Sequence, residues 1–293
     1  MSALLTALAI CRFAHFMGAM LTFGMSAYLA CAPERLRLAL SPAARRFALT
    51  ASLIALITAI LWLQLESASM ADDLSAAIDP GAIGAVIGDT AFGHAWAAHC
   101  VLAAALVAIV VFGPRDRWGL AAAASAALLA SLGLVGHAAM QSGAEGILHR
   151  LNHAVHLLAA GAWLGGLIPF AMCLRAFERD DLRRDSLRAM MGFSFWGQLV
   201  VAAVVLTGVA NIAMTSGHPP IPPTTPYRAL LVAKIVVVAV MISLALFNRF
   251  VLAPRIKASL RALALLRSTC AAEIALGSLA VALVSVFALL DPA

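Results

Sequence analysis

Histidine is the residue type whose number and spacing most clearly predict chemistry in this chain, which contains eight of them. On a helix of 3.6 residues per turn, His149, His153 and His156 fall within about 60° of arc, and Trp163 continues that face. Earlier in the chain, His137 and Met140 are three residues apart and share a face. Imidazole and thioether groups suit Cu(I), and imidazole alone suits Cu(II), zinc or haem iron. The pattern predicts a metal site.

The predicted ligands are side chains that the topology described below places near one surface of a membrane. They are His15, His94, His99, His137, Met140, His153 and His156. A lone histidine in an apolar helix is usually a packing residue with a hydrogen bond, but so many at one level favour metal binding by some of them. His149 is interpreted as a loop residue.

Ionisable residues inside apolar segments form a second group of candidates. Arg12, Lys234 and Glu273 lie in such segments, where each costs about 2.5–3.5 kcal/mol on insertion scales. Lys234 shares a helical stripe with Met241 and Asn248. These groups predict an ion path or gate; interhelical ion pairs, or side chains extended towards an interface, are the structural alternative.

The composition requires a membrane around these residues. The chain of 293 residues is 63% hydrophobic and 12% charged, with a mean hydropathy of +0.97, whereas a soluble domain carries about 25% charged residues. Lipid must therefore solvate much of it. The net charge of +6 does not indicate nucleic acid, because the basic residues lie between apolar blocks and not on one face.

Apolar stretches long enough to cross a bilayer occur eight times, which predicts an all-α polytopic transmembrane bundle. The expected spans are 4–32, 47–66, 92–113, 118–140, 150–174, 190–214, 228–250 and 268–290. Most basic residues occupy alternate connections, and loop 67–91 carries four aspartates and no basic residue. The positive-inside rule therefore predicts that both termini lie on the outer side.

A weak internal repeat predicts two four-helix halves, residues 1–140 and 141–293. Two pairs of motifs match: Arg12-x-x-His15 with Gly24 resembles His153-x-x-His156 with Gly165, and Thr90-x-Phe92 with His99 resembles Thr225-x-Tyr227 with Lys234. No nucleophile elbow, Walker loop, dinucleotide fingerprint or HExxH motif occurs, so we do not expect an enzyme. The five cysteines are scattered without a CxxC pair.

Two segments carry a family resemblance. They are Gly136-His137-Ala138-Ala139-Met140 and residues 151–167, LNHAVHLLAAGAWLGGL; residues 225–234, Asn248-Arg249 and Glu273 add to it. The chain resembles the copper resistance D (CopD/PcoD) family of bacterial inner-membrane proteins. That resemblance implies copper handling, usually described as copper transport beside a small periplasmic copper-binding partner. It favours His15, His137, His156, Trp163, Lys234, Asn248 and Glu273; position 153, often acidic in the family, is His here.

The resulting prediction is uptake of copper from the periplasm across the inner membrane, with both termini periplasmic. The His/Met cluster would bind the ion, and the expected pathway or gating residues are Arg12, Trp163, Lys234, Asn248 and Glu273. One alternative is a haem-b electron carrier, since histidines on facing helices also suit bis-imidazole haem ligation. The other is a non-transporting copper sensor or a dock for a periplasmic copper chaperone.

Overall fold

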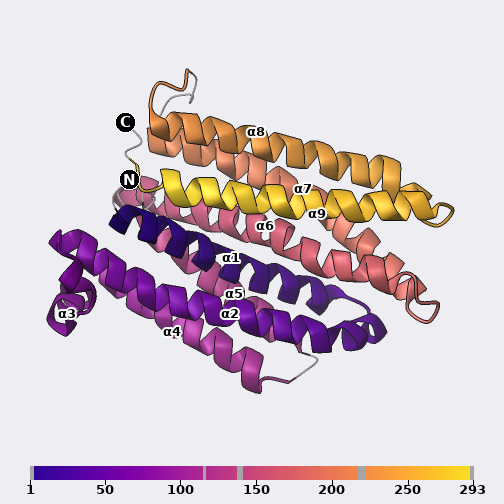
Figure 1. Cartoon of the computed structure of the whole chain (residues 1–293), viewed down its shortest axis with the longest axis horizontal. Coiled ribbons are helices and arrows are strands. Elements are labelled where there is room, and N and C mark those ends of the chain that lie inside the picture. Colours follow the sequence, from indigo (N-terminus) through magenta and orange to yellow (C-terminus); the bar gives the residue numbers. More distant parts are fainter. Residues whose placement is uncertain (1–2, 115–116, 137–140, 217–221, 291–293) are drawn as a thin grey trace.

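A computed structural model describes residues 3–114, 117–136, 141–216 and 222–290 of the chain. Within these ranges every regular element is a helix, which confirms the predicted all-α membrane bundle (Figure 1). The helices are α1 (Ala3–Cys31), α2 (Glu34–Ala71), α3 (Pro80–Asp89), α4 (Ala91–Phe112), α5 (Trp118–Ser131), α6 (Gly143–Ala176), α7 (Arg183–Ser216), α8 (Pro226–Phe247) and α9 (Leu260–Phe287). His137 and Met140 lie outside the described residues.

Seven of the described helices are long and apolar enough to cross a membrane: α1, α2, α4, α6, α7, α8 and α9. The predicted span 118–140 is represented by a shorter apolar segment, α5 followed by the 3₁₀ turn η2 (Leu132–Leu134). The count of eight spans therefore stays a prediction. Figure 1 shows the start of α1 and the end of α9 at the same end of the bundle as α3.

The acidic segment 67–91 contains structure of its own. Helix α2 continues to Ala71, and the 3₁₀ turn η1 (Leu74–Ala77) leads into the short helix α3. Asp73 caps η1, and Asp79 caps α3 by accepting from the backbone N–H groups of Gly81 and Ala82. Hydrogen bonds from Ser75 hold the pKa of Asp73 below its ordinary value. These aspartates thus act as helix caps in addition to setting the charge of the segment.

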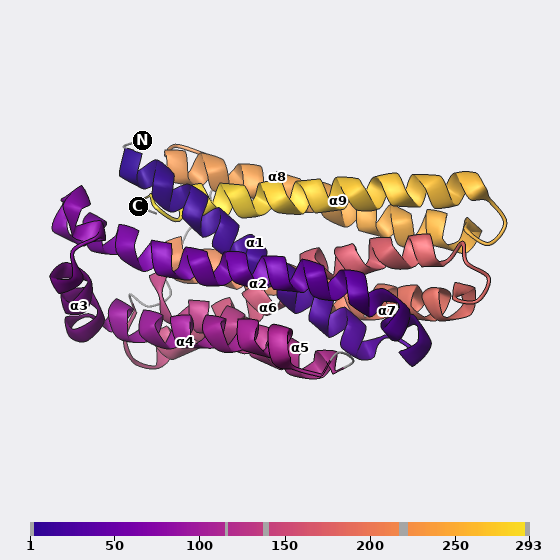
Figure 2. The same ribbon diagram turned by 60° about the horizontal axis from the view of Figure 1, so that its bottom comes forward.

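The long helices pack as two groups that meet at α1 and α6. In the first group α1 packs against α2 and α5, and α4 packs against α2 and α5; in the second, α6 packs against α7 and α9, and α8 packs against α9. Helix α1 also packs extensively against α6, and Figures 1 and 2 show these two helices between the outer ones. The division of the chain near residue 140 stays a prediction.

Two glycines allow α1 and α6 to cross with their backbones in contact. A Cβ atom added to Gly24 would lie 2.4 Å from the Cα of Gly165, and one added to Gly165 would lie 2.2 Å from the carbonyl oxygen of Met20. Small residues permit such close approach between membrane helices. The crossing therefore depends on the absence of a side chain at both positions, which are also the matched glycines of the internal repeat.

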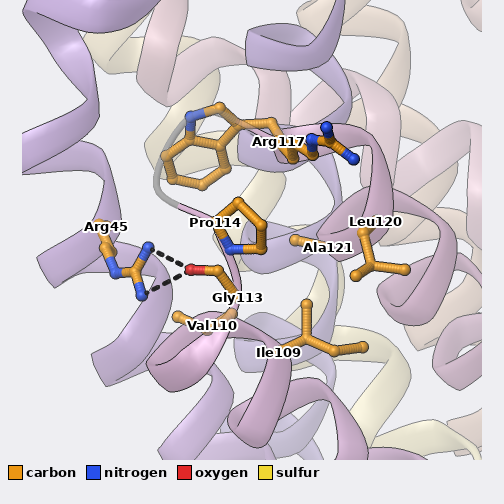
Figure 3. Close-up of a pocket in the computed structure, with 9 residues that line it drawn as sticks. Arg45, Ile109, Val110, Gly113, Pro114, Arg117, Leu120 and Ala121 are labelled. Atoms are coloured by element: carbon orange, nitrogen blue, oxygen red, sulfur yellow. Dashed lines mark hydrogen bonds between the residues drawn. The ribbon is translucent and has the colours of Figure 1, made fainter.

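At the end of the bundle away from the chain termini, an arginine joins α2 to the end of α4. The guanidinium of Arg45 donates to the carbonyls of Val111 (2.7 Å) and Gly113 (3.2 Å), as Figure 3 shows for Gly113. The last carbonyls of a helix have no partner within it and carry partial negative charge, so a cation stabilises them. The hollow lined by these residues has a volume of about 20 Å³, which is room for about one water.

The second group of helices is more open than the first. Helices α2 and α4 pack directly on each other, whereas α7 packs mainly on α6 and α8 mainly on α9. A cleft with a volume of about 1210 Å³ lies between α7 and α8. Its walls include Phe193, Trp196 and Ile242, and it reaches inward to Trp163 and Glu273.

We expect Gly24→Ala to destabilise the protein, because the added methyl group would overlap the backbone of α6. The expected loss is on the order of 1–3 kcal/mol, the usual cost of overpacking, measured as a lower unfolding temperature in detergent. Gly192→Ala is the matched control, since nothing lies within 4 Å of the added Cβ there. Equal unfolding temperatures for the two variants would contradict the proposed crossing.

Candidate metal site

Two of the predicted ligands face each other in the first group of helices. The Nε2 atoms of His15 on α1 and His99 on α4 are 2.9 Å apart. Both side chains are almost fully buried, with exposures of 0% and 1%. The two imidazoles therefore form a pair in which the Nε2 atom of each ring faces the Nε2 atom of the other.

The other nitrogen of His15 fixes the orientation of that ring. Its Nδ1 lies 3.0 Å from the carbonyl oxygen of Ala55 and 3.2 Å from the hydroxyl of Thr58, both on α2. A carbonyl oxygen can only accept, so Nδ1 of His15 carries the hydrogen. In the neutral ring, Nε2 of His15 then presents a lone pair to His99.

A serine on α5 gives His99 two possible arrangements. Its Nδ1 is 2.8 Å from the hydroxyl of Ser131, which is also 2.7 Å from the carbonyl of Leu128. A serine hydroxyl has one hydrogen. If Ser131 donates to His99, the Nε2–H of His99 donates to His15 and the pair is closed. If Ser131 donates to Leu128, His99 donates from Nδ1, and two Nε2 lone pairs face each other.

The second arrangement is electrostatically incomplete unless a cation lies between the rings. Two acceptors without a shared proton or metal repel each other, and no water-accessible surface is available to either ring. Metal-binding histidines characteristically use their second nitrogen for a hydrogen bond of this kind, which fixes tautomer and orientation. The geometry can thus alternate between a hydrogen-bonded pair and a two-nitrogen cation site.

Aromatic rings enclose the pair. Trp96 stacks on His99 with centroids 4.6 Å apart and an angle of 19°, and Trp62 meets His15 edge-on at 5.7 Å. The indole of Trp96 is itself held by a 2.8 Å hydrogen bond to the carbonyl of Ala59. The rings separate the histidines from lipid and restrict the space around them.

Two charged residues, Arg12 and Glu66, interact next to the pair; Arg12 is about one helical turn before His15 on α1. The guanidinium of Arg12 lies 4.8 Å from the centre of the Trp62 ring and interacts electrostatically with Glu66 on α2. The thiol of Cys11 donates to the carbonyl of Thr58 at 3.2 Å. Arg12, predicted as a pathway residue, is therefore balanced by a carboxylate that the sequence reasoning did not single out.

The structure separates the other predicted ligands that it describes from this pair. His94 is exposed on α4, and His153 and His156 belong to α6 in the second group of helices. Within residues 3–114, 117–136, 141–216 and 222–290, no three His, Cys, Asp or Glu side chains come together as a metal site. Among the described candidates, the structure places His15 and His99 in contact.

The second group of helices contains a related arrangement around His156. Its Nδ1 is 2.9 Å from the hydroxyl of Thr207 on α7. Lys234 on α8 acts on His156 electrostatically, and its ammonium lies 5.8 Å from the centre of the Phe287 ring on α9. His149, interpreted from the sequence as a loop residue, is instead buried on α6 with a 3.0 Å hydrogen bond to Gln141.

Three predicted pathway residues meet near the floor of the cleft. The amide of Asn248 donates to Glu273 at 2.6 Å and accepts from Thr269 at 2.6 Å, and Trp163 also hydrogen-bonds Glu273. Asn248 begins the π-helical segment η4 (Asn248–Leu252), directly after α8. Such local widening of a helix is frequent at functional sites.

Sequence reasoning missed the residues that orient the imidazoles: Thr58, Ser131, Thr207 and the two tryptophans Trp62 and Trp96. A hydroxyl in an apolar helix and a tryptophan three residues before His99 were the available signals. Neither signal identifies its partner, because the contacts join different helices.

We expect the neutral protein to carry hydrogen on Nδ1 and not on Nε2 of His15, because the Ala55 carbonyl can only accept. The ¹⁵N spectrum of histidine-labelled protein reports the tautomer directly, and His15→Gln assigns the resonance. His94→Gln, at an exposed position, is the control for labelling. A protonated Nε2 in neutral His15 would contradict this geometry.

Comparison with known proteins gives matches along most of the chain. The family described as "Copper resistance protein D-like, N-terminal domain" matches residues 1–147, and "Copper resistance protein D" matches residues 187–287. No solved structure matches significantly.

Two curated relatives are similar to the chain. The "Inner membrane protein YebZ" of Escherichia coli (strain K12) is 33% identical over 283 residues, covering 96% of this chain and 97% of that protein. "Copper resistance protein D" of Pseudomonas syringae pv. tomato is 32% identical over 176 residues, covering 58% and 56% respectively. These matches and the helical membrane fold place the chain in the copper resistance protein D family.

Proposed function

We propose that this chain transports copper across the bacterial inner membrane and that the His15–His99 pair is the binding site on the way. Membership of the copper resistance protein D family supports a role in copper handling. The name of the Escherichia coli relative and the seven long apolar helices support a multi-pass protein of the inner membrane. The observation that carries the proposal is the 2.9 Å approach of two buried Nε2 atoms.

The size of the gap determines what binding requires. Metal–imidazole bonds are about 2.0 Å long, so an ion between two opposed nitrogens needs them roughly 4 Å apart. The observed 2.9 Å separation corresponds to the hydrogen-bonded form without the ion. Binding would therefore require the hydrogen of His99 to be on Nδ1, with Ser131 donating to Leu128, so that both Nε2 lone pairs face the ion; the two rings would move apart by about 1 Å.

The number of ligands favours Cu(I) as the transported ion. Imidazole is a suitable copper ligand, and Cu(I) is stable with two nitrogen ligands, whereas zinc sites take four. In the described part of the chain, no third His, Cys, Asp or Glu side chain completes the pair. Low coordination also suits a transporter, since an ion held by few ligands can leave.

The haem alternative fits this pair less well. A haem between two imidazoles requires a flat slot as wide as the macrocycle. Here the rings of His15 and His99 are in hydrogen-bond contact, with Trp62 and Trp96 packed against them. A copper ion needs only a small displacement of the rings, and this difference favours copper.

The charge pattern supports loading from the periplasm. The positive-inside rule predicts that the chain termini are periplasmic, and His99 is nearer to the start of α4, at the end of the bundle with the termini, than to its end. Arg12 and Glu66 would lie between that surface and the pair. Asn248, which follows the end of α8, and Glu273, midway along α9, would attract the ion on its way out. A periplasmic copper-binding protein would serve as the donor.

We expect His15→Ala and His99→Ala each to abolish copper binding, because one imidazole cannot hold the ion alone. The measurement is copper per purified chain after anaerobic incubation with Cu(I), and His94→Ala, which removes an exposed imidazole from α4, should behave as wild type. Unchanged stoichiometry in both pair variants would overturn the site. A Soret band in the purified protein would favour the haem alternative instead.

We expect cells that express the protein to accumulate more copper than cells with an empty vector, and His99→Ala to remove the difference. The reason is that the ion can cross the apolar layer only where side chains replace its water. Equal accumulation with and without the protein would contradict import. Tight copper binding without flux into proteoliposomes would favour the sensor or docking alternative.

A further inference from the structure

Each of the two groups of helices holds one histidine in the same way. His15 on α1 contacts the hydroxyl of Thr58 on α2, and His156 on α6 contacts the hydroxyl of Thr207 on α7, in both cases through Nδ1. Each threonine donates to the carbonyl four residues earlier on its own helix, Ile54 in one case and Ala203 in the other.

A backbone contact extends the correspondence between the two groups. The carbonyl three residues before each threonine, Ala55 or Val204, also bonds the imidazole. The two imidazoles are therefore anchored by equivalent groups on the helix that follows them.

The second residue of each pair lies at the same position of a corresponding helix. Helix α4 begins after Thr90, whose hydroxyl accepts from Gly93, and α8 begins after Thr225, whose hydroxyl accepts from Arg228. Nine residues after these caps stand His99 and Lys234. His99 is in hydrogen-bond contact with His15, and Lys234 interacts electrostatically with His156. The second group of helices thus carries an ammonium where the first carries an imidazole.

The charge of Lys234 has no carboxylate close by among the described residues. The ion pairs there join Arg179 to Asp181, Arg183 to Asp180 and Arg267 to Glu178, and none includes Lys234. The ammonium instead lies over the ring of Phe287. In a medium of low dielectric constant, an uncompensated cation strongly repels a second one. A metal ion at His156 would meet this repulsion. The other imidazole that acts on His156 is His153, on the same helix, and α8 supplies no imidazole that faces His156 as His99 faces His15.

We propose that Lys234 is the resident cation of the second group of helices and restricts the chain to one copper-binding pair. The anchored imidazole of His156 interacts with the tethered ammonium, whereas that of His15 interacts with a removable ion. This inference rests on the proposed function in one respect, that His15 and His99 bind Cu(I). It replaces the sequence prediction that His153 and His156 are ligands.

The test is the amount of Cu(I) bound per purified chain in variants of Lys234. Wild type should bind one ion, and Lys234→His should bind two, because a second imidazole would then face His156. Adding His156→Ala to Lys234→His should return the value to one. Ile235→His, which adds a histidine at a position on α8 that is 43% exposed, is the matched control and should bind one.

Two further variants make the outcome decisive. Lys234→Cys offers a smaller soft ligand if the imidazole does not fit, and it should also bind two ions. His99→Ala combined with Lys234→His should retain one ion, at the second site alone. Lys234→His and Lys234→Cys proteins that are monodisperse and bind no more copper than wild type would overturn the inference. Wild-type protein without copper would instead overturn the proposed function, while the combined variant still tests the second site.

Discussion

The rest of the structure depends on the requirement that two imidazoles buried in an apolar bundle be satisfied without water. In lipid, an unpaired nitrogen is costly, so every ring atom that can form a hydrogen bond needs a protein partner. The Ala55 carbonyl and the Ser131 hydroxyl take the outer nitrogens, and the inner ones are left to each other. The aromatic rings around them maintain this isolation. A cation can join such a pair only when His99 carries its hydrogen on Nδ1, facing Ser131, and not on Nε2 between the rings.

The two groups of helices solve the same packing problem with different electrostatics. In the first, α2 and α4 pack directly, and the charges near the histidines, Arg12 and Glu66, compensate each other. In the second, α7 and α8 are separated by a cleft, a lysine stands beside the histidine, and the carboxyl of Glu273 is held by an amide. In the function proposed above, the first group would hold an exchangeable ion, whereas the second holds a fixed charge.

The helical membrane bundle could be predicted from the sequence, because length and hydropathy identify the seven long apolar helices; the eighth expected span, 118–140, corresponds to a shorter apolar segment. The repeat also identified His15, His99, His156 and Lys234 as related positions. The direct pairing of His15 with His99 could not be predicted, since 84 residues separate them and their contact depends on how α1 and α4 pack around α2. The helix caps Asp73 and Asp79 were seen only as loop charge, because capping depends on backbone geometry.

The crossing of α1 and α6 has a mechanical consequence. Because Gly24 and Gly165 place two backbones in contact, neither helix can move closer to the other, and separation would open an unfilled gap in the middle of the protein. Rocking about that point preserves the contact. The glycine contact is thus a pivot for such a tilt. His15, more than two helical turns from Gly24 along α1, would then shift together with His99 relative to the second group of helices.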